Sequence, residues 1–466
     1  MSGLMQFIDR TIWYLFLALL VFVSFVQTNY GSGDWYLISC VCYCLCAVVF
    51  LRMTQANAKQ YNIKALISAK TSLLIFSLML VYLLLQMFIP YESSLYDRVF
   101  QPGATPIPDW FNPIRVLSVT PALTYDLFWS ELTMFSAFFL GIVLISSRRR
   151  LKQVIFVIFI VGLIHALVGV FAKFSSILLV DAAQVDGHFS VARGWFINRN
   201  HYAAFIGLTL VSALSYQLKW VIAYRGNNYL FFLSSQLLSI RVSVIIAIVL
   251  SFLALSLSQS RAGFFAVFIA MFGVLAITGG QSKAFGKRRW IFLGLFTTAI
   301  LIVYYSGSEL MTRLHSNELM LGERLPQWSL TWALIQQEWL FGYGGNSYAT
   351  VFQSTRGDAE LREVIYAQAH NDYLHILLEQ GLIGALLWLG LISAIFKHAW
   401  AVYFKASSSL VSGVILSAMV VISAALLQSI VGFNLQILSI RFYFFIIIAL
   451  TFAAPKIHNR AVKPTS

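Results

Sequence analysis

Long apolar runs separated by short polar segments occupy most of the 466-residue chain. A run of about 20 apolar residues is long enough to cross a bilayer as a helix, and about twelve such runs can be delimited. They cover residues 11–27, 35–51, 71–89, 126–146, 153–172, 203–222, 242–258, 262–279, 290–306, 371–396, 409–428 and 433–453. This pattern predicts an all-α polytopic membrane protein with about twelve transmembrane helices.

Composition favours the same class. Hydrophobic residues make up 59% of the chain and charged residues only 11%, whereas a globular domain is about half apolar and about a quarter charged. The first run follows Arg10 and lacks a small-x-small cleavage pattern, so we expect it to be retained. All four cysteines lie in CVCYCLC, residues 40–46 of the second run. A spacing of two turns about 200° on a helix, so they cannot converge on a metal.

The net charge is +14, and the distribution of the basic residues predicts the orientation of the chain in the membrane. With the N-terminus inside, 21 of the 32 Lys and Arg residues fall on the cytoplasmic side. The basic clusters at 148–152 and 283–289 are the strongest anchors, because short Lys/Arg-rich loops stay cytoplasmic. We therefore expect both termini in the cytoplasm, and we expect the bilayer as a partner and no nucleic acid.

Two outer connections are long. Residues 91–125 contain five prolines and are predicted to be extended. In 307–369, Trp328, Trp332 and Ile335 follow Pro326 at helical spacing. This helix could rest at the membrane interface or cover an outer site. The predicted organisation is a nine-span region at 1–306, an outer loop with amphipathic helices at 307–369, and a three-span region at 370–466.

Polar groups collect on the predicted outer side. ARGWFINRNHY places Arg193, Arg199 and His201 before the sixth span, and Arg261 lies at the turn between the seventh and eighth. His370 opens the tenth span. Ionisable residues at such positions are functional candidates, and guanidinium groups are natural partners of phosphate oxygens.

The stretch AQAHNDYLHILLEQGLIGALLWL, residues 367–389, combines a polar start with an apolar helix. Asp372, His375 and Glu379 share one helix face, whereas His370 faces elsewhere. A metal site on that face is conceivable but not favoured. We expect Glu379 to accept hydrogen bonds or pair with an Arg and so hold the helix end.

Four blocks resemble the O-antigen ligase and polymerase superfamily, polytopic enzymes of bacterial surface polysaccharide assembly. The most specific is HNDYLHILLEQGLIG at 370–384. The others are GWFINRNHYAAFIGL, SQSRAGFFA and PQWSLTWALIQQEWLFGYGGNSY, in family order. At 428–440 the chain has Gln428 and Gly432 where many relatives have a His and an Asp, so no role is assigned to that block.

The resemblance implies a glycosyltransferase-C-like bundle whose long periplasmic loop shapes an acceptor cleft. It implies transfer of a glycan from undecaprenyl diphosphate to an acceptor sugar hydroxyl, without a metal or other cofactor. His370 would be the general base, and Arg261 and Arg199 would stabilise the departing diphosphate. The other candidate substrate-binding residues are Arg193, Asn198, Asn200, His201, Asn371, Tyr373 and Glu379.

Alternatives remain open. The acceptor could be a lipid A-core sugar (a ligase), a growing repeat on the carrier (a polymerase) or a protein Ser or Thr. A transporter of lipid-linked sugars would need charges at mid-membrane in several helices, whereas here they gather on one side. No phosphate-cradling glycine loop is found, which argues against a nucleotide-sugar enzyme. We expect location in the bacterial inner membrane with the site facing the periplasm.

The predicted orientation can be tested by cysteine labelling in a background without the native cysteines. Because of the basic asymmetry, we expect cysteines replacing Thr105 and Thr355 to react with an impermeant reagent in intact spheroplasts. A cysteine replacing Gly286 should react only after lysis. Labelling of position 286 from outside would reverse the orientation.

Overall fold

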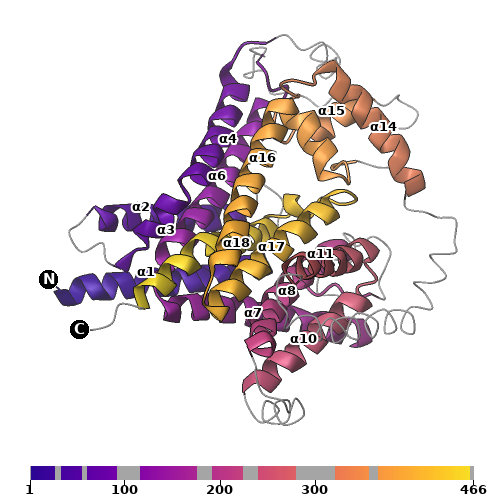
Figure 1. Cartoon of the computed structure of the whole chain (residues 1–466). Coiled ribbons are helices and arrows are strands. Elements are labelled where there is room, and N and C mark those ends of the chain that lie inside the picture. Colours follow the sequence, from indigo (N-terminus) through magenta and orange to yellow (C-terminus); the bar gives the residue numbers. More distant parts are fainter. Residues whose placement is uncertain are drawn as a thin grey trace.

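The computed structural model describes residues 2–26, 33–54, 60–91, 116–175, 191–223, 240–279, 321–355 and 366–461. In these ranges it is almost entirely helical. The helices are α1 (Ser2–Phe25), α2 (Gly33–Met53), α3 (Ile63–Ser68), α4 (Lys70–Phe88), α6 (Pro121–Leu144), α7 (Arg148–Ser175), α8 (Arg199–Ala223), α10 (Ile240–Leu257), α11 (Arg261–Gly279), α14 (Leu321–Gln337), α15 (Tyr348–Ser354), α16 (Asp372–Lys405), α17 (Ser409–Ser429) and α18 (Leu438–Ala461), with the 3-10 turn η3 (Asn434–Gln436) (Figure 1). The all-α polytopic class is confirmed.

Eight helices of the described ranges are long and apolar enough to cross a membrane: α1, α2, α4, α6, α7, α16, α17 and α18. Three further predicted spans, 203–222, 242–258 and 262–279, are helical as α8, α10 and α11. The candidate span at 290–306 lies outside the described residues, as do most of the Pro-rich connection and the first part of the 307–369 loop.

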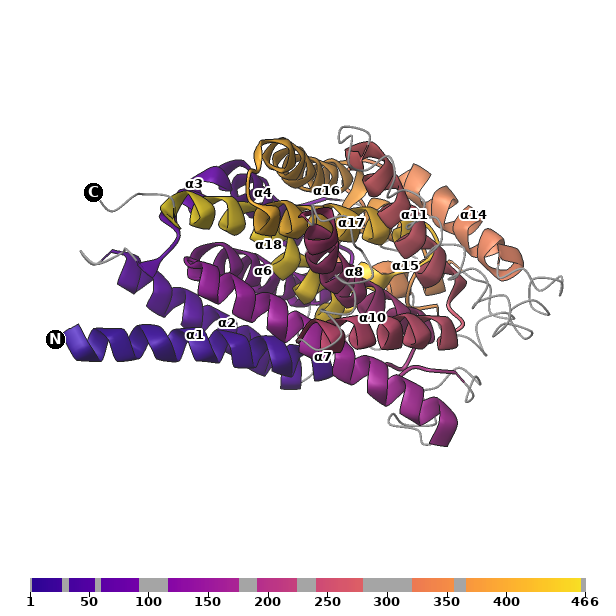
Figure 2. The same cartoon turned by 60° about the horizontal axis from the view of Figure 1, so that its bottom comes forward.

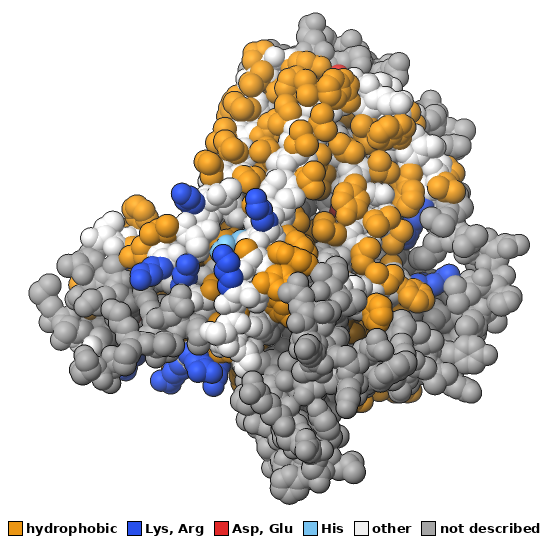
Figure 3. All heavy atoms as spheres, viewed as in Figure 1, with side chains coloured by type: hydrophobic (Ala, Val, Ile, Leu, Met, Phe, Trp, Pro, Cys, Tyr) orange, Lys and Arg blue, Asp and Glu red, His pale blue; other side chains and the backbone are white. Residues whose placement is uncertain are grey.

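The helices form one bundle around α18. In the apolar window of α18, 94% of the residues are buried, against 33% for α2 and α16. Helix α18 packs on α6 and α17, and α17 packs in turn on α8, α11 and α16. The outer helices carry exposed apolar side chains, among them Phe50, Leu74 and Leu389. Such an apolar exterior is the expected lipid-facing surface, and much of the face in Figure 3 is hydrophobic.

Both termini lie at one end of the bundle, and α14 lies at the other (Figure 2). At the terminal end, Arg52 makes a two-pronged contact with Asp9, at 3.2 Å and 3.0 Å, and the Tyr61 hydroxyl donates to the same carboxylate at 2.9 Å. Inside the bundle, Glu131 of α6 pairs with Arg441 of α18. These contacts neutralise charges that would be costly unpaired.

Helix α16 is broken near its start. Gly381 has φ 60° and ψ −166°, a conformation essentially restricted to glycine. A short helix therefore ends before Gly381, and a longer one continues to Lys405. The apolar run predicts an unbroken helix over 371–396 in which Gly381 only allows close packing. The structure corrects this prediction.

The segment 338–345, after α14, crosses this break and bonds to its backbone. The Tyr343 and Gly344 amides donate to the carbonyls of Leu378 and Glu379 at 2.9 Å and 2.8 Å. On the other side of the break, the Leu382 amide donates to the Trp339 carbonyl at 2.8 Å. The groups released by the broken helix are thus satisfied, as a low-dielectric surrounding requires.

Helix α4 closes the same contact. The Tyr82 hydroxyl donates to the carbonyls of Phe341 and Gln380, at 2.8 Å and 2.9 Å. The Gln86 side-chain amide donates to those of Phe341 and Glu379, at 2.9 Å and 3.0 Å. The segment 338–345, α4 and the start of α16 therefore form one hydrogen-bonded unit.

Glycine is required in both segments that meet at the break. A Cβ on Gly381 would lie 2.3 Å from the Leu340 carbonyl oxygen, and one on Gly342 would lie 2.5 Å from the Gly381 nitrogen. Both residues also have positive φ, at 60° and 70°. The two backbones approach at a distance that no side chain permits.

Replacing Gly381 with Ala should therefore destabilise the protein. We expect a cost of at least about 1–3 kcal/mol from the backbone conformation alone, with the clash added. Thermal unfolding followed by tryptophan fluorescence in detergent should show a clearly lower midpoint. The matched control is Gly390→Ala on the same helix, where a Cβ would meet only Ile75 at 3.9 Å. An unchanged midpoint for Gly381→Ala would mean that the break is not fixed by this contact.

Candidate active site

Two of the predicted site histidines pack against the same aromatic ring. The ring of Phe433, between α17 and η3, has His201 at a centroid distance of 4.6 Å and His370 at 4.9 Å, each at an interplanar angle of 73°. His201 belongs to the first turn of α8, and His370 precedes α16 by two residues. We call these three residues the histidine cluster.

His201 is held by the chain that follows α17. Its Nδ1 lies 2.8 Å from Oδ1 of Asn434, and the side-chain amide of Asn434 donates to Oε1 of Gln428 at 2.8 Å. All three side chains are buried. The 428–440 block, to which the sequence assigns no role, therefore supplies two of the residues around the histidine cluster.

His370 is half-buried and has a positive φ of 51°, which is uncommon for a residue other than glycine. Burial lowers the pKa of His370 to about 4, and the charges of Arg324 and His201 add to this lowering. The imidazole is therefore neutral and able to accept a proton across the physiological pH range.

Arg324 is a cation of this site that sequence reasoning missed. Its Nη1 donates to the carbonyl of Val431 at 2.6 Å, two residues before Phe433. On the same helix, Trp328 Nε1 donates to the carbonyl of Ala369 at 2.8 Å. Helix α14 thus binds both the residue before His370 and the segment before Phe433. It begins at Leu321, five residues before the predicted start, so that Arg324 lies inside the helix.

Arg199 and Arg261 begin two adjoining helices. Asn198 Oδ1 accepts from the Asn200 amide at 2.7 Å and caps α8, and Asn200 Oδ1 accepts from Ser260 Oγ at 2.8 Å, which joins α8 to the turn before α11. Each arginine is the first residue of its helix. Arg199 directly precedes Asn200, and Arg261 directly follows Ser260. Helix N-termini favour anions, so both arginines belong to helix ends that stabilise negative charge.

Several predicted substrate-binding residues make contacts within the protein. Arg193 is buried and donates to the Ile197 carbonyl at 3.2 Å. Asn371 is the N-cap of α16 and accepts from the amides of Tyr373 and Leu374. The Tyr373 hydroxyl donates to the Leu426 carbonyl at 2.8 Å. These side chains therefore stabilise the backbone around the site.

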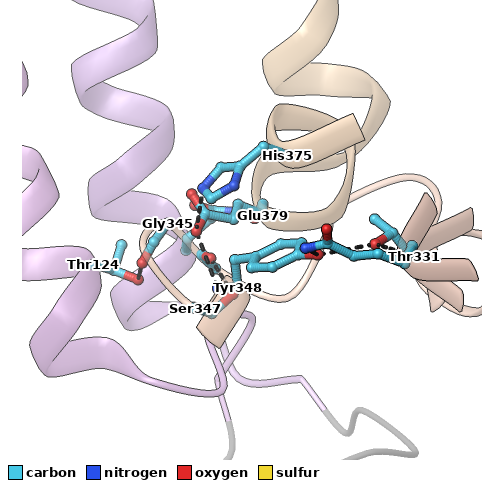
Figure 4. A network of polar contacts seen from close by, with 10 residues as sticks. Thr124, Thr331, Gly345, Ser347, Tyr348, His375 and Glu379 are labelled. Atoms are coloured by element: carbon cyan, nitrogen blue, oxygen red, sulfur yellow. Dashed lines mark hydrogen bonds and ion pairs between the residues drawn. The ribbon is translucent and has the colours of Figure 1, made fainter. Parts of the chain in front are cut away.

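Glu379 lies in a buried network with Tyr348 and His375 (Figure 4). Its Oε1 accepts from the Tyr348 amide at 3.1 Å and lies 3.0 Å from Nε2 of His375. The His375 ring stacks on that of Tyr348 at 4.9 Å. The expectation that Glu379 accepts hydrogen bonds is met, by Tyr348 and His375 in place of an arginine. We therefore assign Glu379 a structural role in place of substrate binding.

An apolar cavity of about 830 Å³ runs along α16. It begins at Asp372, whose Oδ2 accepts from Ser429 Oγ at 2.8 Å, and it reaches Lys397. Between these ends its lining residues from α16, α17 and α18 are almost all apolar, among them Ile376, Trp388 and Phe444. Because Asp372 is the first residue of α16 and follows His370 by two residues, one end of this long apolar cavity lies at the start of α16.

Comparison with known sequence families matches part of the chain. Residues 246–389 match a sequence family described as O-antigen ligase. Over these residues, the predicted resemblance to the O-antigen ligase and polymerase superfamily is confirmed. The matched segment includes Arg261, Arg324 and His370 but ends short of Asn434, and His201 precedes it. No curated protein matches the chain.

The lowered pKa of His370 can be tested without an activity assay. Replacing Arg324 with Gln removes the larger of the two neighbouring charges, so the pKa of His370 should rise from about 4 but stay below its ordinary value, since burial remains. Carbethoxylation modifies only neutral imidazole. Its pH dependence at His370, measured by peptide mass spectrometry, should shift upwards in Arg324→Gln and not in Arg149→Gln, an exposed arginine in the first turn of α7. Identical curves for wild type and Arg324→Gln would contradict the assignment.

Proposed function

We propose that this membrane protein is a metal-independent glycosyltransferase of the O-antigen ligase type. It transfers a glycan from undecaprenyl diphosphate to an acceptor sugar hydroxyl at the periplasmic face of the bacterial inner membrane. The observation that carries the proposal is the histidine cluster. In it His370 contacts Phe433, the charge of Arg324 acts on His370, and a long apolar cavity begins two residues further on, at Asp372.

The proposed reaction divides the work between His370 and the arginines. The acceptor oxygen attacks the anomeric carbon of the donor while its proton passes to His370. A new carbon–oxygen bond forms, and the bond between the anomeric carbon and the diphosphate oxygen breaks. The bonding electrons leave with the diphosphate, whose charge Arg261 and Arg199 stabilise. His370 then releases its proton to the departing diphosphate or to water.

The cavity along α16 suits the lipid part of the donor. Its polar lining lies mainly at its two ends, beside Asp372 and Lys397, so its length accepts hydrocarbon. An isoprenoid chain lying there would leave its diphosphate at the end near His370. This arrangement supports a donor delivered from within the membrane.

Polymerase activity on the growing repeat and transfer to a protein hydroxyl use the same chemistry and remain alternatives. Deleting the gene separates them, because loss of all chains from lipid A-core indicates a ligase and single repeats left on core indicate a polymerase. A transporter of lipid-linked sugars is disfavoured by the one-sided gathering of the proposed site residues at helix starts.

The role proposed for Arg261 predicts that lysine cannot replace it. An ammonium group makes no two-pronged contact with phosphate oxygens. Losing a contact made mainly in the transition state should lower the rate by about 10²-fold or more. Arg261→Lys should therefore be nearly inactive in glycan transfer, and Arg199→Lys should also be impaired. Arg149→Lys is the matched control and should keep wild-type activity. A fully active Arg261→Lys protein would reduce Arg261 to a membrane anchor.

The function itself is tested by transfer from purified undecaprenyl-diphosphate glycan to lipid A-core in nanodiscs, with a chelator present. General-base catalysis contributes about 10²–10⁴-fold, so His370→Ala should lose detectable transfer and still bind the donor. His398→Ala, at the far end of α16, should remain active. Near wild-type turnover by His370→Ala would place the base elsewhere. Activity that needs an added divalent ion would overturn the metal-independent mechanism.

A further inference from the structure

The hydrogen bonds behind His201 have a defined direction. The side-chain amide nitrogen of Asn434 donates to Oε1 of Gln428 at 2.8 Å. Asn434 therefore turns its carbonyl oxygen, Oδ1, towards Nδ1 of His201, 2.8 Å away. A carbonyl oxygen only accepts, so the hydrogen of this bond belongs to Nδ1 of the imidazole.

A neutral imidazole carries one hydrogen, so Nε2 of His201 has a free lone pair. Within the described part of the chain, Nε2 has no hydrogen-bond partner, and it is not among the polar atoms closed off from solvent. His201 is therefore an acceptor held in one tautomer and aimed by a buried pair of amides. His370 contacts the same Phe433 ring.

We propose that His201 accepts, through Nε2, a hydrogen bond from a second hydroxyl of the acceptor sugar, and that Asn434 and Gln428 are positioning residues that fix its tautomer. The inference rests on the proposed glycan transfer and makes it more specific. The acceptor would be a polyhydroxyl ring that presents one hydroxyl to His370 and another to His201. A monohydric alcohol would lack the second contact.

The surroundings of the two amides support a positioning role. The small cavity beside Asn434 and Gln428 is lined by apolar residues of α8, α11, α17 and α18, including Ala204, Val267 and Phe444. No described ionisable side chain borders it. The charged or titratable groups of the site near His201 are His370, which contacts the same Phe433 ring, and Arg324, whose charge also acts on His370. Arg199 and Arg261 are the first residues of α8 and α11. Two amides in apolar surroundings bond to each other and to His201, since burial without partners would be costly.

Replacing Asn434 with Asp gives the sharpest test, because it keeps the shape and adds a charge. A carboxylate opposite Nδ1 raises the pKa of His201. Below the raised pKa, Nε2 is protonated and cannot accept the sugar hydroxyl. Above it, the contact returns. In the transfer assay, Asn434→Asp should raise KM for the acceptor about 3–10-fold at pH 6, the worth of one hydrogen bond, and KM should return towards the wild-type value by pH 9.

Three comparisons complete the experiment. Asn434→Leu offers no acceptor to Nδ1 and should raise KM for the acceptor at every pH, with a smaller effect on kcat. Asn346→Asp, a change of the same size outside the histidine cluster, should keep the wild-type pH profile. In protein labelled with ¹⁵N-histidine, the His201 signals, assigned by their loss in His201→Gln, should show hydrogen on Nδ1 in wild type and not in Asn434→Leu.

Each outcome decides the inference. A wild-type pH profile for Asn434→Asp, or a pH-independent loss equal to that of Asn434→Leu, would leave these residues a structural role only and overturn it. Hydrogen on Nε2 in the wild-type protein would overturn it as well, whether or not transfer is observed. Absence of transfer by the wild-type protein would count against the proposed function, and the ring signals would still decide the tautomer.

Discussion

The site depends on one backbone contact, the approach of Gly342 to Gly381. A transmembrane helix that breaks must find partners for its released amides and carbonyls, because lipid offers none. Here the partners come from residues 338–345 and from Tyr82 and Gln86 of α4. The approach is so close that a Cβ on either glycine would overlap backbone atoms. The break is thus stabilised by protein contacts near the start of α16.

This contact sets the position of everything on either side of it. Because the short first part of α16 is fixed through Leu378 and Glu379, His370 and Asn371 enter the bundle at a defined angle. Because 338–345 is fixed as well, α14 is held over the same place and brings Arg324 to the segment before Phe433. The Glu379 carboxylate adds to this unit by binding the first amide of α15. Helices α14 and α16 thereby share one attachment, which also fixes the chain next to His370.

The sequence predicts the helices better than it predicts the site. Apolar runs of membrane length locate eleven of the described helices, because burial in lipid imposes length and composition directly. His370, His201 and the two helix-initial arginines could be singled out because polar groups at span ends are costly. The break at Gly381 could not be predicted, since a glycine in an apolar run can equally be a position of close helix packing. Arg324, Phe433 and Asn434 were missed because their importance comes only from contacts across more than 60 residues of chain.

The electrostatics of the site follow from this assembly. Arginine stays charged in any surrounding that proteins provide, whereas histidine loses its charge when it is buried near other cations. Burial and the charge of Arg324 lower the pKa of His370 to about 4. Arg324 therefore helps to keep the adjacent imidazole neutral. In the proposed reaction, the negative charge of the leaving diphosphate would offset the charge of Arg324 and make the proton on His370 more stable at the moment the reaction places it there.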